Sequence, residues 1–385
     1  MIPLYYNVRS LAARRLSTGL TVLGLSLVVF VFAAVLMLSN GIESALSAGG
    51  SRQNAVLLRE GALTEIGSVV PREAVAVVGN WPQVASSPEG TALAAGELLV
   101  IVALPRDGDT FANISARGVT GPSWEARPAA RITEGRQPRP GSFEIALGSS
   151  LIGAGSGAEV GGELEFAGQR WPVVGRLSAG GGAFESEIWA DRNRLGQAFN
   201  RPGLTSAIVR LTSPDAFPEL KRRIEGDRRF ELKAMREDEY WEEQASATAT
   251  FIRVLGLFVA FVFSIGAVLG AMITMFAQVS ARIRELGAMR AIGFARGTVL
   301  AGVVIESALL GAVGGLLGSL GATAMRFVKI ETLNFATFSQ ISFGFAPTPG
   351  ILLAALLFGL GMGVSGGILP ALKAARLGIL DAVRA

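Results

Sequence analysis

Cysteine and histidine are both absent from this 385-residue chain, and charged residues make up only 17% of it. Without those two residue types the chain cannot form a disulfide, bind a metal through thiolates or imidazoles, or assemble a Ser-His-Asp triad. The charged fraction lies below the roughly 25% that is typical of soluble domains. These absences exclude the commonest metal centres and nucleophilic enzymes. They direct attention to the apolar residues, which make up 50% of the chain.

Four long apolar runs, one near the N-terminus and three in the last third, carry almost no charge. Three of them contain no Lys, Arg, Asp or Glu, namely residues 19–38, 254–281 and 350–372. The remaining run, residues 297–325, is the third along the chain and contains only Glu306. A helix needs about 20 residues to cross a hydrocarbon core of about 30 Å. The pattern therefore predicts an integral membrane protein with helices at residues 17–40, 247–280, 297–325 and 350–372.

The first apolar run has an alternative interpretation as a cleaved signal peptide, because arginines precede it and small residues follow it at 45–47. The run is longer than the 7–15 residues of a typical signal core, which favours a retained helix. Before it, Val8, Leu11 and Ala12 recur at helical spacing among arginines. Residues 1–16 are therefore expected to form an amphipathic cytoplasmic segment at the membrane surface.

Positive charge collects in three short segments beside the apolar runs, at residues 1–16, 281–296 and 373–385. Together they hold ten Lys and Arg and two acids, whereas the whole chain has 35 and 31. Short loops rich in Lys and Arg mark the cytoplasmic side. We therefore expect both termini and residues 281–296 to face the cytoplasm of a bacterial cytoplasmic (inner) membrane. Because topology explains the basic excess, no nucleic-acid partner is expected.

The polar insert at residues 41–246 predicts an extracytoplasmic domain between the first two spans. Strand-like runs bounded by glycines fill its middle, and helix-like segments begin near Pro71 and Pro214. The predicted fold class is thus a membrane α-helical protein whose four spans carry a large α/β domain, with a β-rich subdomain at about 95–200. Residues 326–349 are expected to form an outer loop.

No catalytic constellation emerges from the insert. Two pairs of acids, Glu163 with Glu165 and Glu185 with Glu187, alternate along strand-like runs, which is typical of solvated strand faces. No G-x-x-x-x-G-K-[ST] phosphate loop occurs in these residues. We therefore expect no catalytic residue, no metal site and no cofactor bound by this chain, and any ATP to be bound by another.

The segment at 281–296 is the sharpest local signal. Its apolar residues Ile283, Leu286, Met289 and Ile292 recur at helical spacing, with charged residues around them. It follows the second apolar run without an obvious break, and Gly287 and Gly293 allow a tight turn. Two interpretations stay open. The segment is either an interfacial helix with snorkelling arginines, or a lever that seats in a groove of a partner protein.

Several segments together resemble the MacB/LolCE/FtsX group (type VII) of ABC transporter permeases. The family's coupling segment resembles Arg284-Glu-Leu-Gly-Ala-Met-Arg-Ala-Ile-Gly293, and its C-terminal signature resembles Gly367-Ile-Leu-Pro-Ala-Leu-Lys-Ala-Ala-Arg-Leu377. Residues 7–24 resemble its amphipathic entry into the first span, and Glu306 with the glycines after it resembles its third span. Gly135-Arg136, residues 144–148 and residues 173–175 resemble its outer domain. The insert of about 200 residues is closer in size to that of MacB and the lipoprotein-extracting permeases than to that of FtsX.

The resemblance implies a mechanism and a set of partners. Two permease chains, identical or different, pair and recruit cytoplasmic ABC ATPase subunits, which bind the ATP and Mg. ATP-driven closure moves the coupling helix, and the second span transmits the motion to the outer domain. An extracytoplasmic adaptor or lipoprotein is a further possible partner. The cargo would be a lipoprotein, lipid, peptide or drug. The implied ATPase-coupling residues are Arg282, Arg284, Glu285, Leu286, Gly287, Met289, Arg290, Ile292 and Gly293.

Small and charged residues inside the spans carry two further expectations. Glu306 is either functional, as intramembrane acids commonly are, or a structural contact to the coupling segment about two to three helical turns away. Glycines repeat at close spacing in the third and fourth spans, which predicts smooth faces for helix–helix packing. These helix-packing residues are Gly311, Gly315, Gly359, Gly363 and Gly367.

Two alternatives belong to other functional classes. A secondary transporter is disfavoured, because such proteins usually show internal repeats and interrupted spans. A transmembrane regulator that switches a cell-wall enzyme, as FtsX does, stays open, since it would use the same machinery.

Overall fold

The computed structural model describes residues 15–47, 49–105, 111–153, 157–333 and 340–376, and the chain divides into two compact units. The first, here called the membrane unit, holds residues up to 41, residues 249–328 and those from 344 onward. The second, the outer domain, holds residues 42–248 and 329–343. The amphipathic segment expected at residues 1–16 and the tail expected at 373–385 fall mostly outside the described residues.

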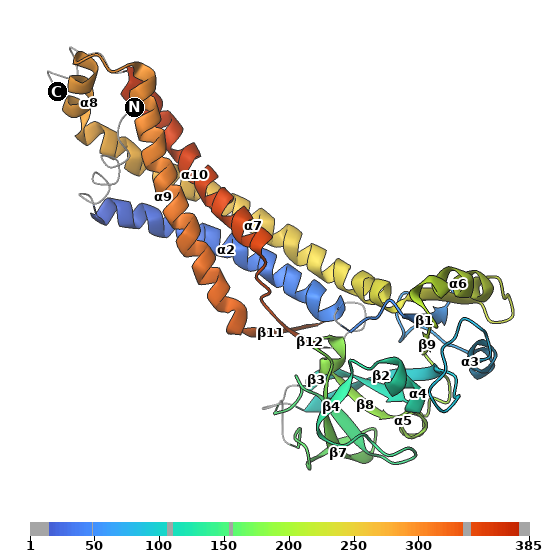
Figure 1. Ribbon diagram of the computed structural model, residues 1–385. Coiled ribbons are helices and arrows are strands. Elements are labelled where there is room, and N and C mark those ends of the chain that lie inside the picture. The colour runs from blue at the N-terminus through green and yellow to red at the C-terminus, as the bar shows by residue number, and fades with distance from the viewer. Residues whose placement is uncertain (1–14, 48, 106–110, 154–156, 334–339, 377–385) are drawn as a thin grey trace. The chain divides into compact units, whose positions relative to one another are not determined.

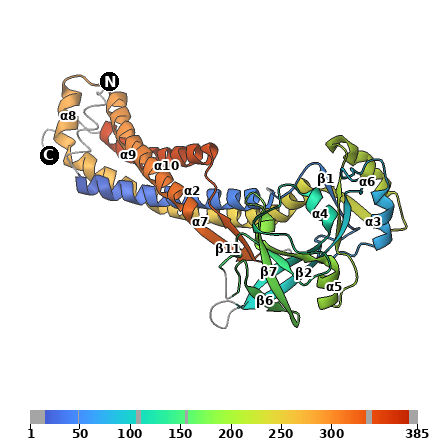
Figure 2. The same cartoon turned by 60° about the horizontal axis from the view of Figure 1, so that its bottom comes forward.

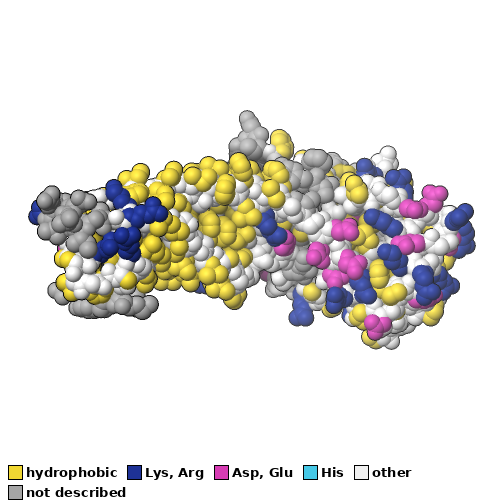
Figure 3. Space-filling model, turned by 90° about the horizontal axis from the view of Figure 1, so that it is seen from above, with side chains coloured by type: hydrophobic (Ala, Val, Ile, Leu, Met, Phe, Trp, Pro, Cys, Tyr) yellow, Lys and Arg dark blue, Asp and Glu magenta, His cyan; other side chains and the backbone are white. Residues whose placement is uncertain are grey.

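Among the described residues, four helices are long and apolar enough to cross a membrane (Figure 1). They are α2 (Arg15–Ser47), α7 (Glu237–Ala281), α9 (Arg296–Ala324) and α10 (Pro349–Arg376). On the face that Figure 3 shows, hydrophobic side chains cover much of the membrane unit, and Lys and Arg collect at one end of it. Large apolar side chains such as Phe258, Phe261 and Ile273 stay exposed along α7. Such a surface suits lipid, so the predicted helical membrane fold is confirmed.

A single mixed sheet forms the frame of the outer domain. Its strands are β1 (Asn54–Arg59), β2 (Ala94–Pro105), β3 (Phe111–Val119), β4 (Arg131–Gly135), β5 (Ile145–Gly148), β6 (Glu163–Phe166), β7 (Gln169–Ser178), β8 (Glu187–Asp191), β9 (Ser206–Arg210) and β10 (Leu232–Arg236). The order is β10-β1-β9-β2-β3-β8-β5-β7-β4, with β6 on β7. Neighbours are antiparallel except β3 with β8 and β5 with β7, which run parallel.

Two hydrophobic cores divide this sheet. One is built on β1, β9 and β10 with the helices α3 (Arg72–Gly79) and α6 (Phe217–Glu225). The other is built on β2, β3 and β5–β8 with α5 (Arg192–Ala198), and Trp171 is fully buried in it. The helices lie against the sheet in Figure 2. The second core runs from Leu98 to Phe199.

Short elements complete the domain and its connections. They are α4 (Gly121–Ala126), the 3-10 turns η1 (Ala183–Ser186), η2 (Pro214–Ala216) and η3 (Met325–Phe327), and the helix α8 (Ile283–Ala291). The region expected to be a loop at 326–349 contains a hairpin of β11 (Lys329–Leu333) and β12 (Gln340–Gly344). Both strands carry β-branched or aromatic residues in alternation, which favours pairing over an open loop.

Candidate functional site

The expected coupling segment forms α8 and the turn after it, within the membrane unit. Helix α7 does not run straight into it, because Arg282 leaves the helical conformation at φ −117° and ψ 18°. At the other end, Gly293 has φ +106°, a conformation that favours glycine, and the chain turns there into α9. The segment is therefore a short separate helix set between two bends, and not the continuous extension that the sequence suggested.

The apolar residues of α8 do not all face outward. Leu286 is only 5% exposed and Gly287 is buried, so this part of the stripe packs against the chain itself. Ile292 is 80% exposed and Phe294 is 39% exposed. The expectation that Leu286 seats in a partner's groove is therefore wrong, because the membrane unit already covers it. The apolar surface open to a partner lies in the turn at 292–294.

Arg290 is also placed differently from expectation. Its Nη1 donates to the carbonyl oxygen of Ala375 at 3.1 Å, in the last turn of α10. Carbonyls at a helix C-terminus lack partners inside the helix, and an arginine is well suited to bind them. Arg290 is thus a tie between α8 and the end of α10, where the sequence alone suggested a charge at the rim of an interface. Arg284 and Glu285 lie on the exposed side of α8.

Glu306, the single acid of the third apolar run, meets a cation. The Nη2 of Arg282 donates to its Oε1, and both side chains are at least 90% buried. This ion pair joins the bend between α7 and α8 to the middle turns of α9. Of the two interpretations of Glu306, the contact with the coupling segment is the one that this geometry supports. Breaking a buried pair leaves an uncompensated charge, so the joint should resist separation.

Glycines let α9 and α10 approach to backbone contact. A Cβ added to Gly311 would lie 2.4 Å from the carbonyl oxygen of Gly359, and one added to Gly363 would lie 2.4 Å from that of Ser307. Gly315 and Gly367 face the same seam. The opposite side of α9 packs as closely on α2, because a Cβ on Gly318 would lie 2.6 Å from the oxygen of Ser26. Helix α9 is therefore held on two sides by close packing of small residues.

A buried charge network in the outer domain was not anticipated from the sequence. Arg117 makes paired hydrogen bonds to Glu65 and to Glu187, and a further one to Glu97, at 2.8–2.9 Å. Arg127 binds the other oxygen of Glu97 at 2.6 Å and Glu237 at 2.7 Å. The six side chains are at most 5% exposed. The network is defined by Arg117, Arg127, Glu65, Glu97, Glu187 and Glu237.

The network fixes the start of α7 to both cores of the outer domain. Glu237 is the first residue of α7 and is also bound by the Nδ2 of Asn54 on β1, at 2.7 Å. Tyr240, one turn later, accepts a bond from the backbone N–H of Glu65. Glu97 lies on β2, Arg117 on β3 and Glu187 on β8. The first turn of the longest helix is therefore held by charges from several strands.

Electrostatic interactions within the network favour the ionised forms of Glu65 and Arg117. Burial opposes charge on Glu65, but the positive charge and hydrogen bonds of Arg117 outweigh it, so the pKa of Glu65 lies below its usual value. Burial likewise disfavours the charged form of Arg117, yet Glu187 and Glu65 raise its pKa well above the usual range. Burial in turn raises the pKa of Tyr240, and the charge of Glu65 adds to the effect.

The two acid pairs of the insert behave differently from each other. Glu163 and Glu165 are exposed on β6, as expected for a solvated strand face. The same expectation is wrong for Glu187, which belongs to the network, and for Glu185. Glu185 accepts hydrogen bonds from the hydroxyls of Ser149 and Ser178 and from two backbone N–H groups. Burial opposes the ionisation of Glu185, but these hydrogen bonds outweigh the effect of burial and lower its pKa.

Two family models match the chain in succession. The MacB-like periplasmic core domain matches residues 18–227, and the FtsX-like permease C-terminal domain matches residues 257–379. The first match alone covers more than half of the chain. Together they span both the outer domain and the membrane unit.

Three relatives illustrate the similarity. The uncharacterised ABC transporter permease YvrN of Bacillus subtilis is 32% identical over 115 residues, or 30% of this chain. The macrolide export ATP-binding/permease protein MacB of Neisseria gonorrhoeae is 33% identical over 115 residues, also 30% of the chain. The uncharacterised permease YknZ of B. subtilis is 26% identical over 208 residues, or 52%. The matches span 26%, 17% and 49% of those relatives' own lengths.

The solved structures that the chain matches include the extracellular domain of the noncanonic ABC-type transporter YknZ, from Gram-positive bacteria. It is 15% identical with a TM-score of 0.36, over 47% of this chain and 99% of that one. The periplasmic region of MacB from Actinobacillus actinomycetemcomitans is 11% identical with a TM-score of 0.39, over 50% and 92%.

Proposed function

Because this chain belongs to the MacB- and FtsX-like family of ABC transporter permeases, we propose that it transmits ATP-driven motion from cytoplasmic ATPase subunits to its outer domain. The motion serves to export or extract a substrate. The observation that carries the proposal is the placement of α7. It is one helix of 45 residues whose first turn is locked in the outer domain's charge network and whose last turn reaches the coupling segment.

The ATPase partner docks at the turn after α8. Ile292 and Phe294 expose apolar surface there, and the exposed face of α8 adds Arg284 and Glu285. An exposed apolar side chain on a short cytoplasmic segment suits a hydrophobic groove in a partner. ATP and Mg are bound and turned over by that partner. The chain itself is a non-catalytic transport component that works beside a second permease chain.

The relay runs from this turn to α7 through Arg282. When the coupling turn is displaced, the ion pair of Arg282 with Glu306 carries the displacement to α9 as well as to α7. The glycine contacts on both sides of α9 make α2, α9 and α10 a closely packed group that resists independent sliding. Motion therefore reaches α7 as a shift of a stiff unit.

Export or extraction is favoured over regulation of a cell-wall enzyme. The FtsX-like match is confined to residues 257–379, whereas the outer domain matches the MacB-like core. The relatives named for a substrate are macrolide exporters. For this chain the cargo class is a drug, peptide, lipid or lipoprotein that the outer domain meets outside the membrane, with an adaptor or lipoprotein as outer partner.

The charge distribution sets the orientation that we propose. The basic coupling segment and both termini face the cytoplasm of the inner membrane, and the outer domain faces out. Because the chain has no cysteine, single cysteines at the exposed positions Gln137 and Ala288 report the two sides directly. An impermeant thiol reagent added to intact cells should label position 137 and spare 288. Labelling at 288 without labelling at 137 would show that the orientation is opposite to the one proposed.

A pull-down tests the docking turn. Ile292→Asp places a carboxylate in the proposed interface, and we expect membrane levels as in wild type with ATPase co-purification reduced at least about tenfold. Phe327→Asp is the matched control, because Phe327 is 76% exposed just after the other end of α9. If α8 merely lies on the membrane surface, Ile292→Asp will retain the ATPase as fully as Phe327→Asp does, and the docking proposal fails.

A further inference from the structure

An arginine-lined cavity in the outer domain has no role in the relay. It has a volume of about 330 Å³ and lies between the start of α3, helix α5 and the loop that follows α5. Its lining includes Arg72, Arg192 and Arg201 with the amides of Asn193 and Gln197, and no acid. Cavities of this size hold small ligands. All of the lining belongs to the outer domain, so the site is complete within that unit.

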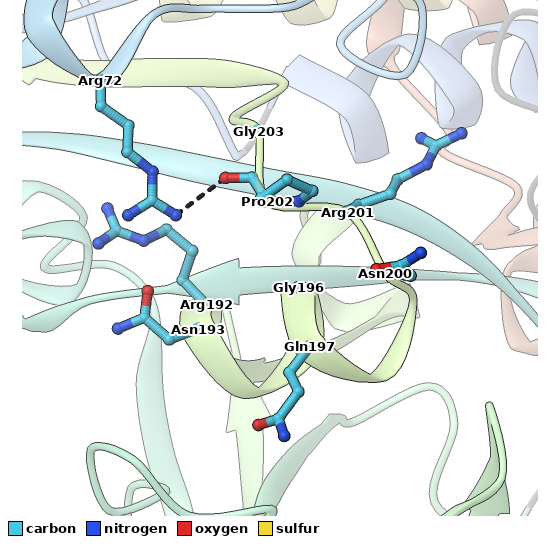
Figure 4. Close-up of a pocket in the computed structure, with 9 residues that line it drawn as sticks. All are labelled: Arg72, Arg192, Asn193, Gly196, Gln197, Asn200, Arg201, Pro202 and Gly203. Atoms are coloured by element: carbon cyan, nitrogen blue, oxygen red, sulfur yellow. Dashed lines mark hydrogen bonds between the residues drawn. The ribbon is translucent and has the colours of Figure 1, made fainter.

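Two of the arginines face each other across the cavity (Figure 4). Arg72 donates from Nη2 to the carbonyl oxygen of Pro202 at 2.9 Å, and Arg192 donates from Nη1 to that of Gly96 at 3.1 Å. These backbone bonds fix both guanidinium groups without neutralising them. Among the described residues neither group forms an ion pair. The side chain of Arg201 points away from the pair in Figure 4.

One hydrogen-bond donor of Arg192 is not satisfied by the described residues. Its Nε is buried and has no hydrogen-bond partner among the described residues. Burial, with the neighbouring charge of Arg72, lowers the pKa of Arg192, and the opposing effects of Asp191 and Glu97 are smaller. Asp191 is occupied by the backbone N–H groups of Asn193 and Arg194, and Glu97 by the charge network. A buried unpartnered donor beside a like charge calls for an anion.

We propose that this cavity binds a phosphate group. Two guanidinium groups supply two positive charges, which a phosphate dianion balances and a single carboxylate does not. Guanidinium groups bind phosphate through paired N–H donors, and the Nη groups of Arg192 and Arg72 that the two backbone bonds leave unused provide such donors. The amide of Asn193 adds a neutral donor at the rim. The ligand is an inorganic phosphate, a small phosphate ester or a lipid phosphate headgroup, and the site is independent of the ATPase.

Calorimetric titration of the purified full chain in a neutral detergent tests the site. The probes are inorganic phosphate and dihexanoyl phosphatidic acid, with acetate at the same concentrations for comparison. We expect saturable binding of both phosphate compounds and at least about tenfold weaker binding by Arg192→Gln and by Arg72→Gln, since each loses charge-assisted hydrogen bonds. Arg192→Lys, which keeps the charge but loses the fork, should fall between.

Arg228→Gln is the control, because it removes one charge from an exposed residue outside the cavity. It should bind phosphate within about twofold of wild type. Tighter binding of phosphatidic acid than of phosphate would identify a lipid headgroup, and equal binding a free phosphate or small ester. The proposal is overturned if neither probe binds saturably, if acetate binds as tightly, or if Arg228→Gln weakens binding as much as Arg192→Gln. Unfolding followed by tryptophan fluorescence without ligand shows that each variant is folded.

Discussion

The membrane unit and the outer domain are each stabilised internally by a different kind of interaction. In the membrane unit, glycines bring α9 into backbone contact with α10 and α2, and the one acid inside an apolar run, Glu306, is paired with Arg282. In the outer domain, the six ionisable side chains of the charge network are buried at one junction of the sheet. Apolar burial does not drive helices together in lipid, so shape must do it. In the water-exposed domain a buried charge network tolerates no loss, because every member needs its partner.

This contrast predicts its largest effect at the centre of the network. Arg117→Met leaves Glu65, Glu187 and Glu97 without their shared cation, and we expect the outer domain to lose about 3–5 kcal/mol of stability. All five tryptophans lie between residues 81 and 241, so tryptophan fluorescence during urea unfolding reports this unit alone. Arg136→Met, which breaks the partly exposed pair with Glu144, should cost far less stability, because solvent screens that pair. Equal losses of stability in the two variants would show that the buried Arg117 matters no more than the partly exposed Arg136.

The next effect is expected at the charged joint of the membrane unit. Glu306→Gln weakens the bond that Arg282 donates and should lower stability by about 1.5–3 kcal/mol. The double variant Arg282→Met, Glu306→Met removes both charges and should recover much of that loss. Heating in detergent, followed by the monodisperse fraction on size exclusion, compares these proteins with the single variants Arg282→Met and Glu306→Met. A double variant as poor as the sum of both single ones would show that the residues act separately.

A smaller effect is expected in the glycine seam. Gly363→Ala places a Cβ 2.4 Å from the oxygen of Ser307, and relieving this overlap should cost about 1–3 kcal/mol. Gly361→Ala, two residues earlier on the same helix, meets nothing within 4 Å and should be neutral or slightly stabilising. The same heating assay compares them. Indistinguishable midpoints would mean that the seam yields easily and does not stiffen the unit.

The smallest effect is a dependence on acid. Because the folded pKa of Glu65 lies below its ordinary value of 4.5, its contribution to stability is complete above pH 4.5. That contribution is lost as the pH falls through the lowered folded value. Urea unfolding at a series of pH values from 6 downward, followed by tryptophan fluorescence, should show a shallower decline for Glu65→Gln than for wild type. Glu60→Gln, at an exposed acid nearby in sequence, should keep the wild-type slope. If the stability of all three proteins declines in parallel as the pH falls, Glu65 does not contribute to the acid dependence.

The spans and most strands could be predicted because their signals are local. Uninterrupted apolar runs located α2, α7, α9 and α10, and the alternation at Glu163 and Glu165 indicated the strand β6. Strand β4 was not predicted, because it is a polar edge strand with no buried face to create an alternating pattern.

The charge network of the outer domain could not be predicted from the sequence for a different reason. Arg117 and Glu187 are 70 residues apart in sequence, and nothing local distinguishes a buried acid from a solvated one. Leu286 illustrates a third limit. Periodicity showed that α8 has an apolar face, but it could not tell whether this chain or a partner covers it. The arginine cavity was likewise invisible, because Arg72 and Arg192 come from different helices.

One measurement addresses the central claim that motion at the coupling turn reaches the outer domain. Arg52 is 82% exposed and pairs with Asp238 in the first turn of α7, so Arg52→Cys can carry an environment-sensitive dye there. With the chain and its ATPase in liposomes, ATP should change the dye's emission. The change should be absent with Ile292→Asp and present with Phe327→Asp. ATP turnover at the full stimulated rate with no change in emission for the otherwise wild-type chain would contradict the account.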